Sequence, residues 1–496
     1  TGWMEQTRRE AEQAEARKRA DSTQKAGEKA VKDGKHRFSS VKIGDVIGEL
    51  KKNMPVDTTY TPMRKGQRPV PQGQGVVITM EEPVKPVPGD TLSKYEKAKQ
   101  LNYNVEFSID QTVTQIDFNY LNSSYQPFTG ASDPIFINPG LNLLFMVSIT
   151  DLMEDYRLSG GLRLNFDLVN NEYLLSYSNN KRRLDQEIVY HRQGFDDYDL
   201  YVFTRHKINE LHYILTYPFT PVLNIRGTAS IRYDRAIFLA TDPINLGRPD
   251  VHTFWGVLKG ELTYDNTRSL GLNLFQGTRY KLFGEYYQLM KAPGSNVVIL
   301  GFDFRNYQRV HRSMIWANRL AGSTSFGTNK LLYYMGGVDN WLWPSFDIST
   351  PVAVNQDYVF QTLATNMRGF YQNIRNGNSF LVLNSELRVP IFRYLFNRPI
   401  RSGFLNNFQI VAFGDVGTAW TGPTPYSEKN QLFTYYIYRK PLYIEVQMLK
   451  DPLVGGIGTG LRSKILGYFV RGDVAWGIED GKIRKPIFYL SLSLDF

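Results

Sequence analysis

The side chains that most often do chemistry are few in this sequence and stand in no catalytic pattern. The chain of 496 residues has six histidines and no cysteine, which excludes thiol catalysis, disulfides and cysteine-ligated metals. The histidines form no HExxH motif and no ligand pair at helical spacing; they are His36, His191, His206, His212, His252 and His311. His206 and His212 are expected in strands or turns. We therefore expect no enzyme, no metal site and no cofactor.

Three local patterns could still suggest a ligand, a nucleophile or a partner. The segment Gly194-Phe-Asp-Asp-Tyr-Asp199 could bind calcium in a loop, but an acidic, solvated turn is the favoured interpretation. The Gly322-Ser323 pair lacks the pattern of a nucleophile elbow. Trp341-Leu-Trp343 is interpreted as membrane-girdle or loop packing, with a partner contact as the weaker alternative.

Three segments in the last third of the chain are more informative about function than these isolated patterns, because they occur in a particular order. Met367-Arg-Gly-Phe370 is followed by Asn384-Ser-Glu-Leu-Arg-Val-Pro-Ile391 and then by Phe413-Gly-Asp-Val-Gly-Thr-Ala-Trp420. A glycine-rich segment, Gly455-Gly-Ile-Gly-Thr-Gly-Leu-Arg462, comes next. In this order the segments resemble the C-terminal barrel of the BamA/TamA superfamily, the bacterial surface antigen family of outer-membrane assembly and translocation proteins.

The resemblance implies a particular site. In that family an Arg-Gly-aromatic loop tip folds back into the barrel lumen, and its arginine contacts acidic residues on the inner wall. The matching tip here is Arg368, Gly369 and Phe370, and the matching acids are Glu386 and Asp415. Two carboxylates can accept charge-assisted hydrogen bonds from one guanidinium, and a buried guanidinium needs such partners. The alternative is that Arg368 is an ordinary loop arginine and Glu386 an ordinary strand acid.

The last nine residues indicate a β-strand of the barrel wall that such a site requires. Apolar and polar side chains alternate strictly along 488–496, which is the period of a β-strand with one apolar and one polar face. A tilted strand of about 9–11 residues spans a bilayer, with apolar side chains outward. The apolar positions are Phe488, Leu490, Leu492, Leu494 and Phe496. The alternative is an edge strand of a soluble sheet.

From about residue 102 onward, short alternating runs separated by turn residues fill the chain. The first run contains Val105, Phe107 and Ile109, and others lie near 158–166, 211–217, 223–233, 279–287 and 381–388. This length divides into about 16 strands, and bacterial barrels have even strand counts. We predict an all-β fold, a transmembrane antiparallel β-barrel at 101–496. A soluble all-β array with several cores is the alternative.

Composition agrees with a barrel. Aromatic residues reach 14% while the mean hydropathy is −0.35, which suits apolar girdles around a polar lumen. The longest apolar runs are too short for a membrane-spanning helix. The net charge is +10, without a recognisable nucleic-acid module. The favoured interpretation of this positive charge is that basic residues lie near anionic lipid headgroups. We therefore expect contact with outer-membrane lipid and lipopolysaccharide and none with nucleic acid.

Residues 1–100 have a different composition and show no alternating runs of this kind. A charged arm rich in Ala, Glu and Lys precedes a proline-rich linker, and together they are expected to form a periplasmic extension. The POTRA modules of the resembled family have no counterpart there. Since Thr1 is not a natural start, we expect a processed form or a piece of something longer. The resemblance suggests the C-terminal part of a propeller–barrel fusion of the TolB-like kind found in Bacteroidota.

The resemblance leads to two functional hypotheses for a Gram-negative outer-membrane protein. The first is an assembly or translocation component, in which the seam between the first strand (near 102–110) and the last (488–496) opens to assist unfolded client proteins. The second is a barrel that inserts nothing and anchors a larger envelope or secretion complex of proteins or lipoproteins. A passive pore is the least favoured, because an inward loop would obstruct the lumen.

Overall fold

The computed structural model describes residues 105–117, 121–122, 124–130, 136–138, 140–165, 170–198, 203–239, 247–353, 355–396, 398–428, 430–439, 442–447 and 450–496. The predicted charged arm and linker at 1–100 lie outside these residues and stay a prediction.

The described part is all-β and is built around one large sheet of 18 strands. Two of these are short pieces, β10 (Arg268–Gly271) and β23 (Lys482–Ile483), which leaves 16 wall strands. The wall strands are β1 (Phe107–Asp117), β3 (Asn142–Asp151), β4 (Tyr156–Asn165), β5 (Glu172–Asn179), β6 (Asp185–Tyr198), β7 (Phe203–Thr220), β8 (Leu223–Phe238), β9 (Val251–Asp265), β11 (Leu274–Leu289), β12 (Asn296–His311), β13 (Met314–Phe326), β17 (Ser379–Val389), β18 (Gln409–Trp420), β21 (Val454–Ile465), β22 (Tyr468–Glu479) and β24 (Ile487–Leu492).

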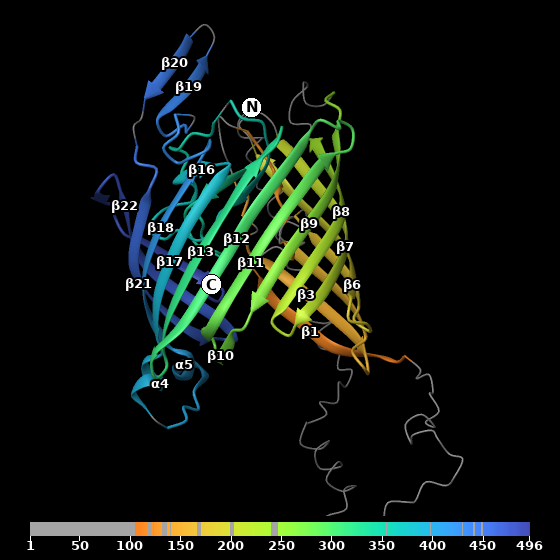
Figure 1. Ribbon diagram of the computed structural model, residues 1–496, viewed down its shortest axis with the longest axis vertical. Coiled ribbons are helices and arrows are strands. Elements are labelled where there is room, and N and C mark those ends of the chain that lie inside the picture. Colours follow the sequence, from red (N-terminus) through yellow and green to blue (C-terminus); the bar gives the residue numbers. More distant parts are fainter. Residues whose placement is uncertain are drawn as a thin grey trace, which may run out of the picture. The chain divides into compact units, whose positions relative to one another are not determined.

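Each wall strand pairs antiparallel with the next in this order, from β1 through to β24. The strands run obliquely around a common interior in Figure 1. The predicted antiparallel barrel of about 16 strands is therefore confirmed.

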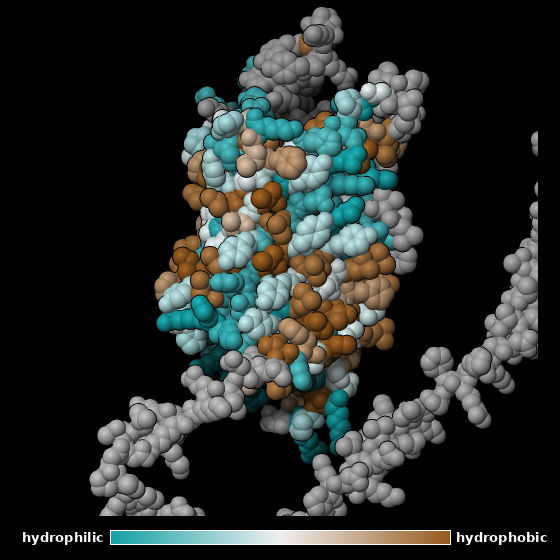
Figure 2. Space-filling view, turned by 90° about the vertical axis from the view of Figure 1, so that its right-hand side faces the viewer, coloured by the Kyte–Doolittle hydropathy of each residue, from teal (hydrophilic) through white to brown (hydrophobic). Residues whose placement is uncertain are grey.

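Side chains alternate across the wall as the sequence predicted. On β7 and β8, Leu211 and Ile231 lie outward and are exposed, whereas Glu210 and Arg232 lie inward and are buried. Figure 2 shows apolar side chains spread over the outer face that it views, with polar ones between them. An apolar exterior around a charged interior is the arrangement of a transmembrane β-barrel.

The two ends of the barrel differ in their connections. At one end, here called the turn end, neighbouring strands are joined by short turns such as 221–222, 312–313 and 466–467. The β9–β11 connection contains β10, and the longest connection at this end joins β17 to β18 and contains α4 (Ile391–Leu395) and α5 (Gly403–Asn407). The opposite, loop end holds the longer connections, including the hairpin of β19 (Thr434–Arg439) and β20 (Leu442–Gln447). Among the described residues, no helix is long and apolar enough to cross a membrane.

A small second sheet lies with the long connection between β13 and β17. It contains β14 (Lys330–Met335), β15 (Tyr358–Leu363), β16 (Arg375–Gly377) and β2 (Gln126–Pro127). Its apolar side chains pack on wall residues: Leu331, Tyr333 and Phe360 cluster with Trp255 and Ile299 from β9 and β12. The lumen is therefore partly filled by a folded plug, and this plug positions the loop tip.

Two sequence expectations were wrong at the level of elements. The segment 194–198 is the end of β6 and not a surface turn, because Asp196 faces Arg205 of β7 and accepts hydrogen bonds at 2.7 and 2.9 Å. The last strand ends at Leu492 and not at Phe496. His206 and His212 lie in β7 as expected.

Candidate functional site

The predicted loop tip lies inside the barrel and is bound to the wall through Arg368. Arg368 is 3% exposed. Its Nε and Nη2 donate to the two oxygens of Asp415 on β18, both at 2.7 Å, and its Nη1 donates to Glu386 Oε1 on β17 at 2.6 Å. The structure therefore brings together the three charged residues that the motifs placed in order. The arginine forms a bidentate pair with one acid and a single bond with the other.

The surroundings of Arg368 hold its two acids in place. Asn384 donates to Asp415 Oδ1 at 2.8 Å, and Arg388 donates to Glu386 Oε2 at 2.9 Å. The guanidinium of Arg368 also lies 3.6 Å from the ring centre of Phe413, close enough for a cation–π contact. Burial opposes its charge, but the carboxylates of Asp415 and Glu386 more than compensate, so the pKa of Arg368 is raised above its ordinary value.

Gly369 and Phe370 join the tip to the last strand. Gly369 has φ +94°, and a Cβ there would lie 2.6 Å from the backbone nitrogen of Gly477 on β22, so only glycine fits. Its N–H donates to Tyr489 Oη at 2.9 Å, and Tyr489 Oη donates to the carbonyl of Phe370 at 2.8 Å. One side chain of β24 thus satisfies two backbone groups of the tip. The motif comparison missed Tyr489, although its inward parity in the terminal alternation was visible.

A second cluster of charges holds the four residues after β24, here called the tail segment (493–496). Asp495 accepts hydrogen bonds from Arg462 of β21 at 2.9 Å and from Arg471 of β22 at 3.2 Å. Arg388 donates to the carbonyl of Phe496 at 3.0 Å. Since Arg388 also binds Glu386, the tail segment and the loop tip belong to one continuous network.

The predicted seam residues are only partly where the alternation placed them. Phe107 and Ile109 lie exposed on β1, whereas Val105 is exposed but precedes the strand. Phe488 is exposed on β24, Leu490 and Leu492 are half-buried there, and Leu494 is exposed beyond its end. Phe496 was expected outside but lies inside, against Leu274, Tyr307 and Ile315.

Among the described residues, the first and last wall strands are not joined by a backbone hydrogen-bond ladder. β1 pairs with β3, whereas β24 pairs with β22 and forms an isolated bridge between Ser491 and Trp341. The N–H of Ile116 on β1 instead donates to the phenol oxygen of Tyr468 on β22, at 2.9 Å. Almost all of β1 is exposed on both faces. β1 therefore presents a free edge, which is a template for an added strand. The edge of β24 is partly occupied, because the N–H of Leu342 donates to the carbonyl of Leu490 at 2.9 Å.

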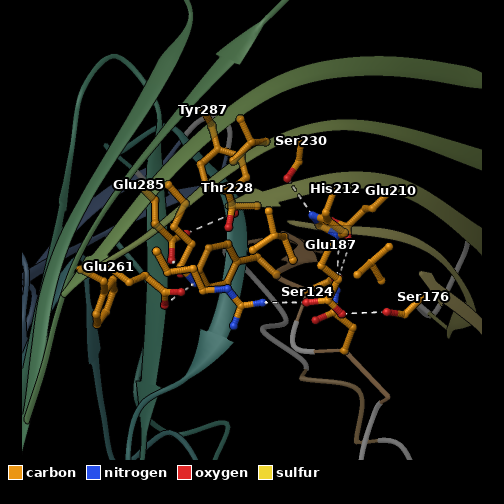
Figure 3. A pocket seen from close by; sticks show the side chains of 18 of the residues that line it. Ser124, Ser176, Glu187, Glu210, His212, Thr228, Ser230, Glu261, Glu285 and Tyr287 are labelled. Atoms are coloured by element: carbon orange, nitrogen blue, oxygen red, sulfur yellow. Dashed lines mark hydrogen bonds and ion pairs between the residues drawn. The ribbon is translucent and has the colours of Figure 1, made fainter. Parts of the chain in front are cut away.

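A luminal cavity of about 490 Å³ lies away from the tip, among β5 to β11 and the segment that carries Ser124 and Tyr125. Figure 3 shows Glu210 and His212 on one side of it and Glu261 and Glu285 on the other. Its charges are mostly compensated by neighbours. Ser230 lies 2.6 Å from His212, Lys259 lies 3.1 Å from Glu285, and Lys281 pairs with Glu261. Beside it, His191 lies 2.6 Å from Glu172 and 3.3 Å from Glu210.

No group of three or more histidine, cysteine or acidic side chains suited to a metal occurs in the part of the chain that the structure describes. Trp341 is buried against Tyr489, with ring centres 4.8 Å apart, whereas Trp343 is exposed. The interpretation of Trp341 as loop packing therefore fits its position. The residues that line the cavity carried no sequence motif, since they come from strands far apart in the chain.

Fold and site together define a transmembrane β-barrel with an inward loop tied to the wall next to its seam. No protein-family model and no curated protein matches the sequence. The chain is similar to the crystal structure of BamA from Haemophilus ducreyi lacking POTRA domains 1–3, at 11% identity, covering 78% of this chain and 76% of that one, with a TM-score of 0.44. It is also similar to CdiB from Escherichia coli, at 11% identity, covering 79% and 67%, with a TM-score of 0.39.

Proposed function

We propose that this protein is an outer-membrane assembly or translocation component whose seam between β1 and β24 assists the insertion or passage of client proteins. The single observation that carries the proposal is the missing ladder between β1 and β24, which leaves the edge of β1 free. A β-strand cannot enter lipid with its backbone groups unpaired. An edge that offers N–H and C=O groups to an incoming strand lowers that barrier through β-augmentation.

The length of the wall strands supports the same proposal. β7 has 18 residues and β8 has 16, far from the seam. β24 has only 6, and β1 and β3 on the other side of the seam have 11 and 10. Since a strand rises by about 3.4 Å per residue, the wall is much lower near the seam than opposite it. A bilayer next to a short wall must thin or deform to match it, and a thinner bilayer is easier for a client strand to enter.

The loop tip has a defined role in this proposal. Arg368 braces β17 and β18, while Gly369 and Phe370 hold β24 through Tyr489. The tip therefore supports the wall on one side of the seam without closing it. The plug also argues against a passive pore, because its side chains fill part of the lumen.

The non-inserting anchor remains a second candidate on one observation. The tail segment is bound by Arg388, Arg462 and Arg471, and breaking such buried ion pairs is costly. A last strand fixed in this way would suit a static barrel. The anchor and the insertase differ in whether the seam must move.

Cross-linking across the seam separates the two candidates. The chain has no cysteine, so Ile116→Cys with Tyr468→Cys gives a unique pair that a short bis-maleimide can join. The matched control is Leu211→Cys with Ile231→Cys, which lie opposite each other on the paired strands β7 and β8. The readout is the folding rate of a client β-barrel protein on vesicles that contain the variant. An insertase loses its effect only with the seam cross-link. Equal acceleration by the cross-linked and uncross-linked seam variants would contradict the seam mechanism, and no acceleration by any variant would favour the anchor.

A further inference from the structure

The connection between β17 and β18 is the longest one at the turn end. Residues 390–408, here called the rim segment, contain α4 and α5 and carry three arginines without a single Asp or Glu. Leu395 is 64% exposed and Phe396 is 58% exposed; Phe404 and Leu405 are also exposed. Neither the loop tip nor the seam uses these side chains.

One part of the rim segment, α5, packs on the outer surface of the wall. Outward positions on β21 are exposed, as Ile457 and Leu461 are, yet the outward Ser463 is only 5% exposed. Its hydroxyl donates to the carbonyl of Phe404 on α5 at 2.8 Å. The start of β18 is therefore preceded by a helix that covers the outside of the neighbouring strand.

An aromatic cluster continues the apolar exterior into the rim segment. Phe408 precedes β18 with the same parity as the outward Ile410. The ring of Phe408 lies 5.5 Å from that of Phe392 and 5.8 Å from that of Phe404. The apolar outer face of the barrel is thus continuous with the exposed apolar side chains of α4 and α5.

The charges lie beside this apolar surface. Arg398 and Arg401 are exposed, whereas Arg393 is half-buried and donates to the carbonyl of Leu270 at 3.0 Å. Tyr394 of α4 lies 2.9 Å from His311 at the end of β12, two strands away from β17. Arginines next to exposed aromatic and aliphatic side chains are typical of a segment that lies in a membrane interface.

We propose that the rim segment binds the phospholipid leaflet at the turn end of the barrel. Leu395, Phe396, Phe404 and Leu405 lie at the acyl boundary, and Arg398 and Arg401 pair with lipid phosphates. Lipid is the occupant because the segment is continuous with the lipid-facing wall and because its charge is complementary to anionic headgroups. This inference rests on the proposed membrane barrel, and it anchors the wall a few strands away from the seam.

The test uses an environment-sensitive fluorophore on single cysteines of the whole chain, reconstituted in vesicles of phosphatidylethanolamine with or without phosphatidylglycerol. The probe is Leu395→Cys. Val416→Cys, on the outward face of β18, is the membrane control, and Tyr426→Cys, exposed at the loop end, is the second control. We expect nitroxide lipids labelled near the headgroup to quench the Leu395 probe, with stronger quenching when phosphatidylglycerol is present.

The arginine contribution is tested in the same labelled chain. Arg398→Gln with Arg401→Gln should remove the dependence on phosphatidylglycerol, whereas lysine at both positions should retain it. An unquenched Leu395 probe beside a quenched Val416 probe overturns the inference, leaves the membrane barrel standing, and makes the rim segment a surface for a protein partner. Failure of quenching at Val416 as well contradicts the membrane barrel itself.

Discussion

At the scale of residues, buried ion pairs in the lumen join the loop tip to the wall, and the two acids share the arginines unequally. Arg368 satisfies both oxygens of Asp415, while Glu386 is shared between Arg368 and Arg388. The order of the motifs was enough to predict the first three residues. It did not predict the roles of Arg388, which stands in the second segment, or of Tyr489, because those roles depend on strand register.

The unequal sharing predicts a graded response to substitution. Arg368→Ala should lower the free energy of unfolding by about 3–5 kcal/mol, because it leaves buried carboxylates without their partner. Asp415→Asn in the Arg368→Ala background should restore more stability than Glu386→Gln, since Glu386 keeps Arg388. Urea unfolding in vesicles, followed by the heat-modifiable gel shift, measures both effects. An unchanged unfolding midpoint for Arg368→Ala would contradict the assignment.

Gly369 predicts a backbone effect at the same site. Gly369→Ala should destabilise the docked tip by at least about 1–2 kcal/mol, the cost of a left-handed backbone for a non-glycine residue, since φ is +94° and the added Cβ meets Gly477. Gly227→Ala is the matched control, because nothing lies within 4 Å of its added Cβ. Hydrogen exchange of residues 366–372 should accelerate in the first variant only. Acceleration in both would point to a general loosening of the wall.

At the scale of elements, alternation predicted the strands well and their ends poorly. The last strand was expected to reach Phe496 but ends at Leu492, because Arg462 and Arg471 bind Asp495 in the lumen and pull the tail segment away from the wall. These partners come from two other strands, so no local pattern could reveal the change of direction. The helices of the rim segment were not predicted either, because each is only five residues long and too short to show a helical period.

The charge cluster around Asp495 predicts how the tail segment is released. Asp495→Asn should weaken the bonds from Arg462 and Arg471 and expose the backbone amide that now donates to Asn273 at 3.0 Å. Hydrogen exchange of residues 493–496 should therefore accelerate. Asp303→Asn is the control, an acid that binds Arg305 and Arg319 elsewhere in the lumen. If the tail segment stays as protected as before, packing of Phe496 holds it and not the charges.

At the scale of the whole molecule, the barrel contains a plug, and its wall is weakest at the seam between β1 and β24. The strands that flank the seam are shorter than those opposite, the ladder is interrupted there, and the loop tip braces only the β17–β24 side. Composition and strand counting could predict the barrel. They could not predict the interruption, because the pairing of the first and last strands depends on the closure of the whole wall and not on either sequence.

The central claim is that client strands pair with the free edge of β1, and site-specific photocross-linking tests it. A photoreactive residue is placed at Val113 on β1, or at Leu258 on β9 as the control within a fully paired wall. A client β-barrel protein is then folded on vesicles that contain the variant. We predict adducts with the client from Val113 during folding, a loss of these adducts when folding is complete, and none from Leu258. Absence of adducts at Val113, or equal adducts at both positions, would contradict the claim.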